Sequence, residues 1–314
     1  MYSADSIFDT ARIWAKEEAN LPTTREAFLI KTIAGENHNE ASPERAVAKP
    51  LTRKASEEFS FWEEMPIAER AKHKYIPAYE WLAYRLSPVM APYVCMPEVR
   101  ILRPESISPK VDGDPLRSRS LYVPNARYID SLTESDKGKL SFFGALIAFD
   151  RRTAKQDTPN PNNYFMAGAG ESLQVATIDY DSIFGRQGRG RTFKKLSEVD
   201  ESRDTNYAHH PEYSAHIPYP SIILEAVAKD PVPYLVTCAR ISRSLDCNKI
   251  KREVEILPSE LMDSTEKARI IQFCRNDEDV MEAMKDFGER YLGIQKRDFQ
   301  STMEQASFKG GKVR

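Results

Sequence analysis

The pattern of apolar and polar residues predicts a strand-rich first half and a mainly helical second half. In the first half the apolar runs are short and are broken by polar turns or prolines, which is typical of strands. We expect strands at residues 28–33, 46–49, 98–102 and 121–123. The first two of these should form a β-hairpin with its loop at residues 35–40. Residues 103–119 are polar, contain several prolines and are expected to form a loop.

Longer segments carry apolar residues at helical spacing. They predict an amphipathic helix at 4–19, a charged helix at 57–71, an apolar helix at 79–86, a buried helix at 140–149, and helices at 221–228, 233–245, 259–275 and 277–292. Between the buried helix and the later ones, the runs 164–166 and 173–178 flank Gly168 and Gly170 and predict a second hairpin. The chain is therefore expected to have an α+β fold.

Composition narrows the class of protein. Of the 314 residues, 41% are apolar and 29% are charged, which indicates a globular protein rather than a disordered one. The net charge of −2 gives no support to nucleic-acid binding. No apolar run approaches the ~20 residues that span a bilayer, and the N-terminus lacks the apolar core of a signal peptide. We therefore expect a cytoplasmic protein without a transmembrane segment.

The four cysteines and the histidines give no sign of a zinc site. Cys95, Cys238, Cys247 and Cys274 lack the C-x₂-C spacing of metal or redox motifs, and free thiols are expected. His209, His210 and His216 lie in a polar segment without a nearby cysteine and are interpreted as part of a solvated loop.

A spacing of carboxylates and an amide suggests phosphoryl transfer. In Asp157-Thr-Pro-Asn-Pro-Asn162 an Asp precedes an Asn by five positions, and Asp179 follows an apolar run. One Asp can orient an acceptor hydroxyl, while the Asn and the second Asp can hold Mg²⁺ on the phosphates of a nucleotide. Upstream, Lys49 ends a predicted strand and Glu80 lies in a predicted helix, where a Lys–Glu pair could bind phosphates.

These motifs resemble those of divergent members of the protein-kinase-like superfamily. Ala46-Val-Ala-Lys49-Pro50 is similar to the lysine strand of atypical kinases, and the helix from Glu80 to Leu86 resembles the helix that pairs with it. Pro97, leading into Glu98-Val-Arg-Ile, is similar to the proline before the next strand. The Asp157–Asn162 and Ile178–Asp179 motifs resemble those of HipA-type kinases, phosphatidylinositol 3/4-kinases and secretory-pathway kinases. A weaker likeness links the chain to kinases that bacteria secrete as effectors, which would place it inside a host cell.

The resemblance implies a bilobal protein-kinase-like fold with a small β-rich N-lobe and a mainly helical C-lobe. We expect an N-terminal helical extension at 1–24, the N-lobe at 25–125 and the C-lobe at 126–314. The resemblance also implies an ATP- and Mg²⁺-dependent kinase that acts on a hydroxyl. Its expected acceptor is a protein Ser or Thr in preference to a phosphoinositide. The implied catalytic residues are Asp157, Lys49 and Glu80, the implied nucleotide-binding residues are Gly35, Asn37 and Lys49, and the implied metal ligands are Asn162 and Asp179.

Several alternatives stay open at this level. Asp150-Arg151-Arg152 is a rival to Asp157 as the catalytic motif, although no Asn follows Asp150 at five positions. Asp181 is either a second metal contact or a turn residue. Thr158-Pro159 replaces the Arg-His that usually follows the catalytic Asp, and Gly35 is the one glycine of the first hairpin loop.

These departures leave two other functions open. A pseudokinase or a module that binds nucleotide or inositol phosphate is one, and adenylyl transfer by the same fold is the other. A basic patch is interpreted as a solvated face, or else as a site for an anionic substrate or an activation-type segment: Arg186, Arg189, Arg191, Lys194 and Lys195. A second basic set is interpreted as scattered surface charges, or else as a site for an inositol polyphosphate activator: Lys72, Lys74, Arg100, Arg103, Lys110, Arg117 and Arg119.

Overall fold

In the computed structural model, four strands are described by their backbone, at residues 12–18, 28–33, 44–49 and 117–121. The other described residues are 75–102, 127, 129, 132–155, 164–168, 170–178, 180, 183–185, 219–275 and 277–309, without the side chains of 102, 164 and 306–309. The chain divides into two compact units. The first comprises residues 1–84, 97–123 and 256–266, and the second comprises 85–96, 124–255 and 267–314.

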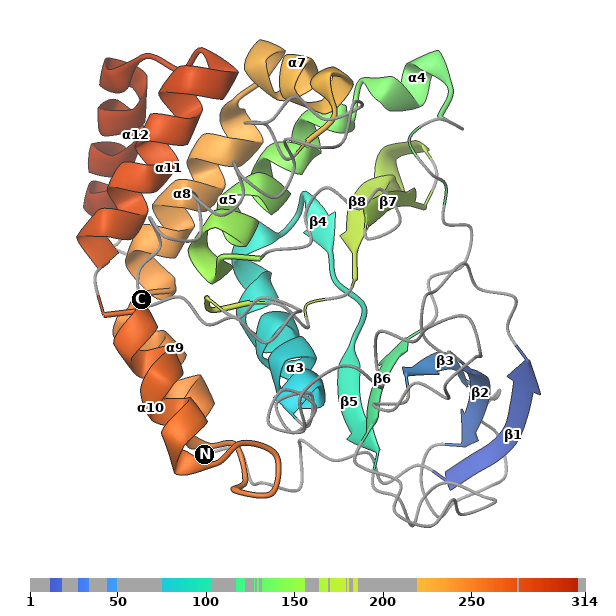
Figure 1. The fold of residues 1–314 in the computed structure, drawn as a ribbon. Coiled ribbons are helices and arrows are strands. Elements are labelled where there is room, and N and C mark those ends of the chain that lie inside the picture. Colours follow the sequence, from blue (N-terminus) through green and yellow to red (C-terminus); the bar gives the residue numbers. More distant parts are fainter. Residues whose placement is uncertain are drawn as a thin grey trace, which may run out of the picture. The chain divides into compact units, whose positions relative to one another are not determined.

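The first unit contains a five-stranded antiparallel sheet (Figure 1). Its strands are β1 (Arg12–Glu18), β2 (Phe28–Ile33), β3 (Glu44–Lys49), β5 (Val99–Leu102) and β6 (Arg117–Leu121), in the spatial order β1-β2-β3-β6-β5. β3 is therefore the central strand and makes hydrogen bonds with β2 on one side and β6 on the other. The predicted pairing of β2 with β3 is confirmed.

Two predictions for this unit are wrong. Residues 12–18 of the predicted N-terminal helical extension form β1, which pairs with β2 through a register shift between Ile13 and Ala15. Residues 117–119 of the predicted loop belong to β6. In both cases pairing with a neighbouring strand outweighs the local sequence, because strand formation depends more on its partners than on intrinsic propensity.

The helix α3 (Ile76–Leu86) follows the sheet's third strand in the chain and is apolar on nearly every side. Pro77 lies in its first turn, where the missing N–H removes no intrahelical hydrogen bond. Ala78, Leu82 and Ala83 are fully buried. The helix begins in the first unit and its last two residues belong to the second.

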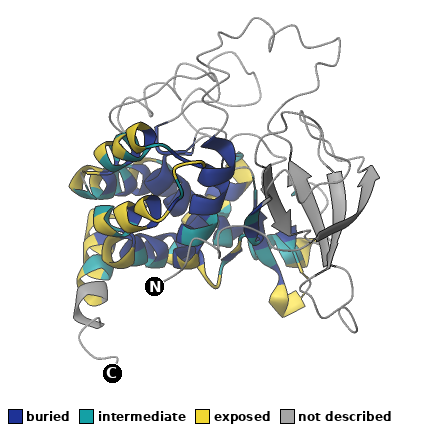
Figure 2. Cartoon of the chain, turned by 90° about the horizontal axis from the view of Figure 1, so that it is seen from below, coloured by how far each residue is buried: buried dark blue, intermediate teal, exposed yellow. Residues whose placement is uncertain are grey.

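The second unit is mainly helical. Its helices are α4 (Glu134–Lys137), α5 (Phe143–Thr153), α7 (Ser221–Lys229), α8 (Val232–Ser244), α9 (Cys247–Glu255), α11 (Asp277–Leu292) and α12 (Lys296–Lys309), while α10 (Ser264–Phe273) begins in the first unit and ends in the second. Every residue of α5 is buried, which confirms the predicted buried helix, and buried residues gather on the inner helices (Figure 2). α5 packs closely on α8 at Gly144, where a Cβ would lie 2.9 Å from the backbone nitrogen of Tyr234.

Three helices of this unit, α4, α9 and α12, were not predicted from the sequence. α9 lies between the helices expected at 233–245 and 259–275, and α12 follows the last predicted helix. α11 has the predicted bounds and begins with three acidic residues, which suit the positive end of the helix dipole. The sequence also favours Asn276 as the N-cap of α11, a position that lies outside the described residues.

A small sheet accompanies these helices, in the order β4-β8-β7. β7 (Tyr164–Ala167) and β8 (Gln174–Thr177) form the predicted antiparallel hairpin, and β4 (Val94–Cys95) pairs with β8 in parallel. Gly168 in the hairpin turn has φ +90°, a conformation that L side chains rarely adopt. The α+β class is thus confirmed, and a bilobal arrangement remains a prediction.

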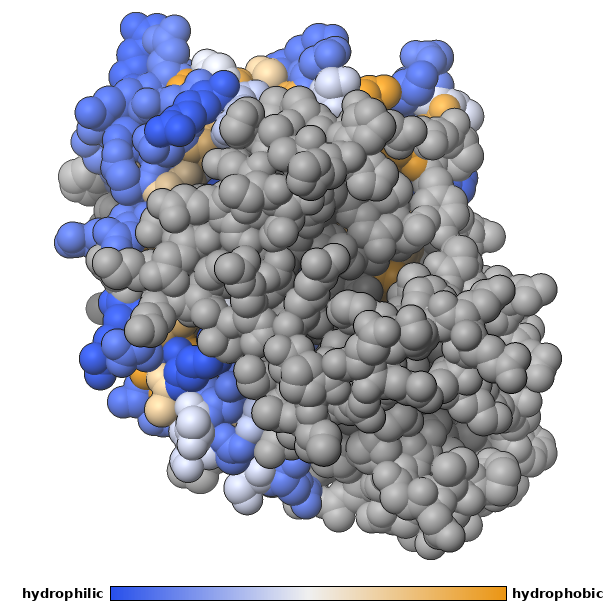
Figure 3. Space-filling model, in the orientation of Figure 1, coloured by the Kyte–Doolittle hydropathy of each residue, from blue (hydrophilic) through white to orange (hydrophobic). Residues whose placement is uncertain are grey.

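The described part of the surface over α11 and α12 is mainly hydrophilic (Figure 3). Within the described residues, none of the helices combines the length and the apolar character required to cross a lipid bilayer.

Candidate functional site

The predicted site residues fall in both units, and five of them lie outside the described residues: Gly35, Asn37, Asp157, Asn162 and Asp179. Lys49 is described by its backbone, and Glu80 is described in full. Both belong to the first unit, whereas positions 157, 162 and 179 fall within the second. The structure nevertheless describes residues near these three positions on either side, and the contacts of those neighbours define the candidate site.

Lys49 ends the central strand of the five-stranded sheet. Its backbone pairs with Ser118 of β6, and Ala48 pairs with Phe28 of β2. Pro50 follows directly and cannot donate a hydrogen bond to a sheet ladder, so the strand ends there. The lysine is thus carried by a strand that neighbours support on both sides.

Glu80 is an acidic residue within an apolar helix. Its exposed fraction is 4%, and its neighbours Tyr79 and Trp81 are also buried. A carboxyl group removed from water to this degree needs a hydrogen-bonding or cationic partner to offset its desolvation. Glu80 is therefore not a solvated surface charge, and its burial favours a pairing role.

Two tyrosine hydroxyls connect α3 and the residue before it to the segment around the start of α10. Tyr75, directly before α3, donates a hydrogen bond to Asp263, and Tyr79 of α3 donates one to Glu266. Asp263 also accepts a hydrogen bond from the backbone N–H of Glu266, 3.0 Å away. These contacts hold the turn of α3 that directly precedes Glu80.

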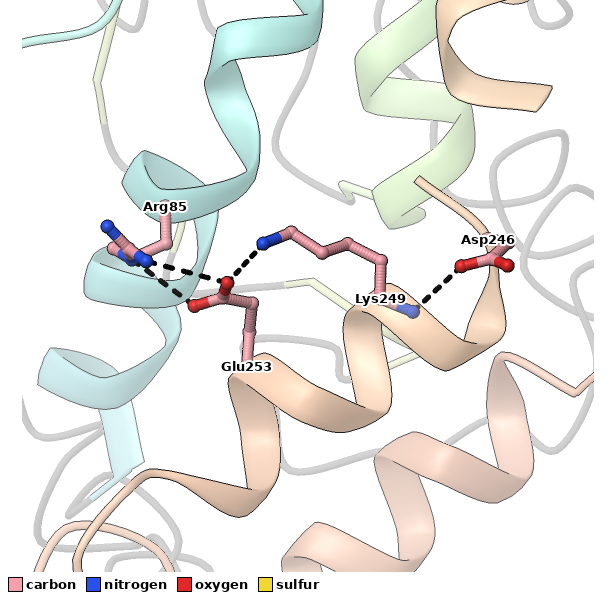
Figure 4. Close-up of polar contacts among 4 residues, drawn as sticks. All are labelled: Arg85, Asp246, Lys249 and Glu253. Atoms are coloured by element: carbon pink, nitrogen blue, oxygen red, sulfur yellow. Dashed lines mark hydrogen bonds and ion pairs between the residues drawn. The ribbon is translucent and has the colours of Figure 1, made fainter. Parts of the chain in front are cut away.

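A buried carboxylate holds the other end of α3 (Figure 4). Glu253 of α9 accepts from Arg85 Nε at 3.2 Å and also pairs with Lys249, one turn earlier on its own helix. Asp246 accepts from the backbone N–H of Lys249 at 2.8 Å and so caps the start of α9. The side chain of Glu253 is 6% exposed, against 24% for Arg85, so the carboxylate is the desolvated member of the pair.

We expect Glu253→Gln to lower the free energy of unfolding by about 1–2 kcal/mol. The amide keeps the size of the side chain but loses its ion pairs, and the loss stays below the ~3–5 kcal/mol of a fully buried pair because Arg85 is partly hydrated. Urea denaturation followed by circular dichroism measures the change. Glu255→Gln on the same helix is the control, because Glu255 pairs with Lys251 on the surface at 3.7 Å and such pairs contribute about 0–1 kcal/mol. Equal losses in the two variants would contradict this role for Glu253.

The Asp150-Arg151-Arg152 motif is buried in the last turns of α5. Arg151 stacks its guanidinium on the ring of Phe287, 4.4 Å from the centroid. Arg152 donates to the carbonyl of Leu245 at 2.9 Å and to Asp277 Oδ1 at 2.6 Å. Both arginines therefore connect α5 to other parts of the second unit.

Asp150 accepts hydrogen bonds from two buried tyrosines. The hydroxyl of Tyr180 lies 2.9 Å from Oδ1, and that of Tyr219 lies 2.8 Å from Oδ2. Burial, and then the negative charge of Asp150, raise the pKa of Tyr180 well above its usual value, so Tyr180 keeps the proton that it donates. Asp150 is 1% exposed. A carboxylate engaged in this way is a structural acceptor, which weighs against the alternative that Asp150 is the catalytic Asp.

The chain turns sharply after α5. Ala154 has φ +51° and ψ +45°, and its N–H lies 3.3 Å from the carbonyl of Arg151. The N–H of Lys155 reaches the carbonyl of Asp150 at 3.0 Å, which completes a Schellman motif. A left-handed Ala costs about 1–2 kcal/mol relative to the right-handed region. Such a conformation persists only where surrounding contacts determine it, and Lys155 supplies them.

Lys155 contacts both neighbours of position 179. Its Nζ donates to the carbonyl of Ile178 at 2.9 Å and lies 3.9 Å from the centroid of the Tyr180 ring. This residue was not predicted to belong to the site, because a lysine in a polar stretch is usually solvated, and no pattern indicates that this one is 1% exposed. The tyrosine partners of Asp150 were also missed, because no sequence pattern indicates which group a tyrosine hydroxyl contacts.

The cysteines and the described acidic residues were compared with the usual patterns of thiol and metal sites. Cys95, Cys238, Cys247 and Cys274 are free thiols, as predicted. Desolvation raises the pKa of all four thiols, and burial brings that of Cys274 to about 12, which disfavours the thiolate of Cys274. Over the described residues there is no group of three or more His, Cys, Asp or Glu side chains that could hold a metal ion.

Comparisons with known proteins give a similarity in structure and none in sequence. No family model matches the chain, and no curated protein matches it. Among solved structures, the Helicobacter pylori proinflammatory kinase CtkA is similar at a TM-score of 0.45 and 11% identity, over 97% of this chain and 98% of that one. A similarity of this degree transfers no property to the present chain, so its function has to be inferred from its own residues and contacts.

Proposed function

We propose that the protein is an ATP- and Mg²⁺-dependent phosphotransferase that moves the γ-phosphoryl group to a hydroxyl. The proposed acceptor is a protein Ser or Thr, as the resemblance to atypical kinases implies. Phosphoryl transfer requires little covalent chemistry from the protein. It requires that phosphates be held, that their charge be neutralised and that the acceptor be aligned. The proposal assigns each of these tasks to residues of this chain.

The observation that carries the proposal is the pairing of β7 with β8. The ladder begins at the pair Tyr164 and Thr177. Asn162 precedes Tyr164 by two residues, and Asp179 follows Thr177 by two. Opposite residues of an antiparallel ladder lie about 5 Å apart. Two segments that leave one end of it can supply an amide and a carboxylate oxygen to one ion, and these are oxygen ligands that Mg²⁺ prefers.

The contacts of Asp150 support Asp157 as the catalytic Asp. Asp150 is engaged by Tyr180 and Tyr219, whereas Asp157 lies five positions before the proposed ligand Asn162. This is the spacing of the protein-kinase catalytic loop, in which the Asp accepts the proton of the acceptor hydroxyl and the Asn binds metal. Asp157 would therefore orient the acceptor, with Asn162 and Asp179 holding Mg²⁺ on the phosphates.

The first unit would hold the nucleotide's phosphates. Its third strand ends in Lys49, and the next described helix carries the buried Glu80. A lysine on the third strand paired with a helix glutamate is the arrangement that binds phosphates in protein kinases. We assign Lys49 to the phosphates, Glu80 to the lysine, and Gly35 and Asn37 of the preceding loop to the nucleotide.

Incubation of the purified protein with ATP and Mg²⁺, followed by intact-mass measurement, tests the proposal. Autophosphorylation should add about 80 Da for each phosphoryl group, and adenylyl transfer would add about 329 Da. Release of phosphate from γ-labelled ATP should depend on Mg²⁺, because the ion neutralises the charge that develops on the phosphates. EDTA and an Asp179→Ala variant serve as controls.

Each outcome separates the proposal from an alternative. A gain of about 329 Da would replace phosphoryl transfer by adenylyl transfer on the same site. Nucleotide binding without mass gain, and without hydrolysis above the EDTA control, would identify a pseudokinase. If nucleotide does not bind either, the chain is an interaction module of another kind and the proposed function fails.

A further inference from the structure

Lys155 is the buried cation of the second unit that lies closest in the chain to the proposed catalytic residues. It follows the left-handed Ala154 at the end of α5 and precedes Asp157 by two positions. A lysine is almost never fully buried without partners, because its ammonium must be desolvated. The partners of Lys155 therefore indicate what its burial stabilises.

These partners lie on both sides of Asp179. The ammonium donates to the carbonyl of Ile178 at 2.9 Å and stands 3.9 Å from the centre of the Tyr180 ring. The first contact is a charge-assisted hydrogen bond and the second a cation–π interaction, and both are stronger when desolvated. One side chain thus binds the residue before Asp179 and the residue after it.

Other contacts attach the same segment to the end of α5. The hydroxyl of Tyr180 donates to Asp150, and its ring meets Phe149 edge-on with centroids 5.7 Å apart. Farther along, the N–H of Phe184 donates to the carbonyl of Thr153 at 2.6 Å. Tyr180 is therefore held at its hydroxyl by Asp150 and at its ring face by Lys155, against a helix whose residues are all buried.

We propose that Lys155 is a positioning residue that sets the place of the metal-binding Asp179 relative to the catalytic Asp157. The inference rests on the proposed function. Its physical basis is that Lys155 is two residues from one carboxylate and bonded to both neighbours of the other. A shift of about 1 Å in such a constellation can cost about 10²-fold in rate. The side chain would act through Ile178 and Tyr180 and would not touch the phosphates.

The test compares Lys155→Met, which keeps the length of the side chain but has no charge or N–H, with Lys155→Arg. Lys155→Met should lower kcat by about 10- to 100-fold and raise the Mg²⁺ concentration for half-maximal activity by about tenfold, since the geometry of the ligand set is lost. The KM for ATP should change by less than about threefold, because the proposed phosphate contacts are elsewhere. Lys155→Arg keeps a cation and a donor and should fall between wild type and Lys155→Met, with about a threefold rise in the Mg²⁺ requirement.

Lys137→Met is the matched control. Lys137 pairs with Glu134 on the surface of α4 at 2.6 Å, and its replacement should leave both kcat and the Mg²⁺ requirement unchanged. Direct binding of Mn²⁺ in the presence of ATP, followed by electron paramagnetic resonance, gives a second readout. It should weaken in Lys155→Met as the Mg²⁺ requirement rises.

The outcomes distinguish the failure of this inference from the failure of the proposed function. An inactive wild-type protein that binds no Mn²⁺ with ATP would overturn both. An active wild type with an unchanged Mg²⁺ requirement in Lys155→Met would overturn the positioning role alone, even if that variant melts at a lower temperature. If Lys155→Met does not fold, Lys155→Arg decides, and wild-type Mg²⁺ dependence in it would overturn the inference.

Discussion

Replacing Asp157 with Asn should lower kcat for phosphoryl transfer by about 10²- to 10⁴-fold, the usual contribution of a general base. The amide keeps the size of the side chain but cannot accept the proton of the acceptor hydroxyl. The KM for ATP should change little, because the proposed nucleotide contacts involve Lys49 and the loop at Gly35 and Asn37. Steady-state phosphorylation measured on the wild type and the variant, under identical Mg²⁺ and ATP, gives both constants.

Asp150→Asn is the matched control for this change, since it makes the same substitution in the rival carboxylate. Asp150 accepts from Tyr180 and Tyr219 while 1% exposed, and hydrogen bonds to a charged group contribute about 1.5–3 kcal/mol each. We expect the free energy of unfolding to fall by about 2 kcal/mol and kcat to fall less than tenfold. The assignment of Asp157 is refuted if Asp157→Asn stays active while a folded Asp150→Asn does not.

Replacing Asp179 with Ala should lower the Mg²⁺-dependent activity by at least about 10³-fold. A carboxylate that binds the metal neutralises and orients the phosphates in both ground and transition states, and its loss leaves the ion without its anionic ligand. Thermal melting offers a measurement that is independent of turnover. Mg²⁺ with ATP at about 100 times Kd should stabilise the wild type by about 2.7 kcal/mol, whereas the variant should show only the shift given by ATP without Mg²⁺.

Asp286→Ala is a suitable control for that experiment. Asp286 pairs with Arg290 on the surface of α11 at 3.0 Å, so its removal deletes a carboxylate far in the chain from the proposed ligands. Its Mg²⁺-dependent activity and thermal shift should equal those of the wild type. A wild-type thermal shift in Asp179→Ala would show that the metal is held by other residues and would overturn the role given to Asp179.

Local pattern predicted most of the regular elements. The helix α11 begins where acidic residues accumulate, and the hairpin of β7 and β8 surrounds Gly168 and Gly170, both of which have a positive φ that few other residues tolerate. These features depend on residues that lie close together in the chain. Short-range sequence therefore suffices to predict them.

The two errors in the first unit occurred where segments distant in the chain decide the structure. Residues 12–18 carry apolar and charged residues in a pattern that also suits a helix, and the pairing with β2 makes them a strand. Residues 117–119 are polar, yet β3 and β5 flank them in the sheet. The tendency of a segment to form a strand depends on the strands that flank it, and these are not part of the local sequence.

The candidate site likewise has features that the sequence predicts and features that only the structure shows. The order and spacing of Lys49, Glu80, Asp157, Asn162 and Asp179 are properties of the sequence, and they were sufficient to suggest phosphoryl transfer. The sequence left both Asp150 and Asp157 open as the catalytic Asp. The burial of Asp150 and its hydrogen bonds from Tyr180 and Tyr219, which weigh against Asp150, are seen only in the structure.

Thus the sequence by itself determined the α+β class, most helices, the hairpin next to the site and the candidate residues, since these depend on composition, periodicity and spacing. Only the tertiary structure showed that Asp150 is buried and accepts hydrogen bonds from two tyrosines, and that Lys155 contacts both neighbours of position 179. From the sequence alone, a charged side chain is predicted to be solvated. Its burial becomes favourable only when groups remote in the chain meet it and replace the hydrogen bonds that it made with water.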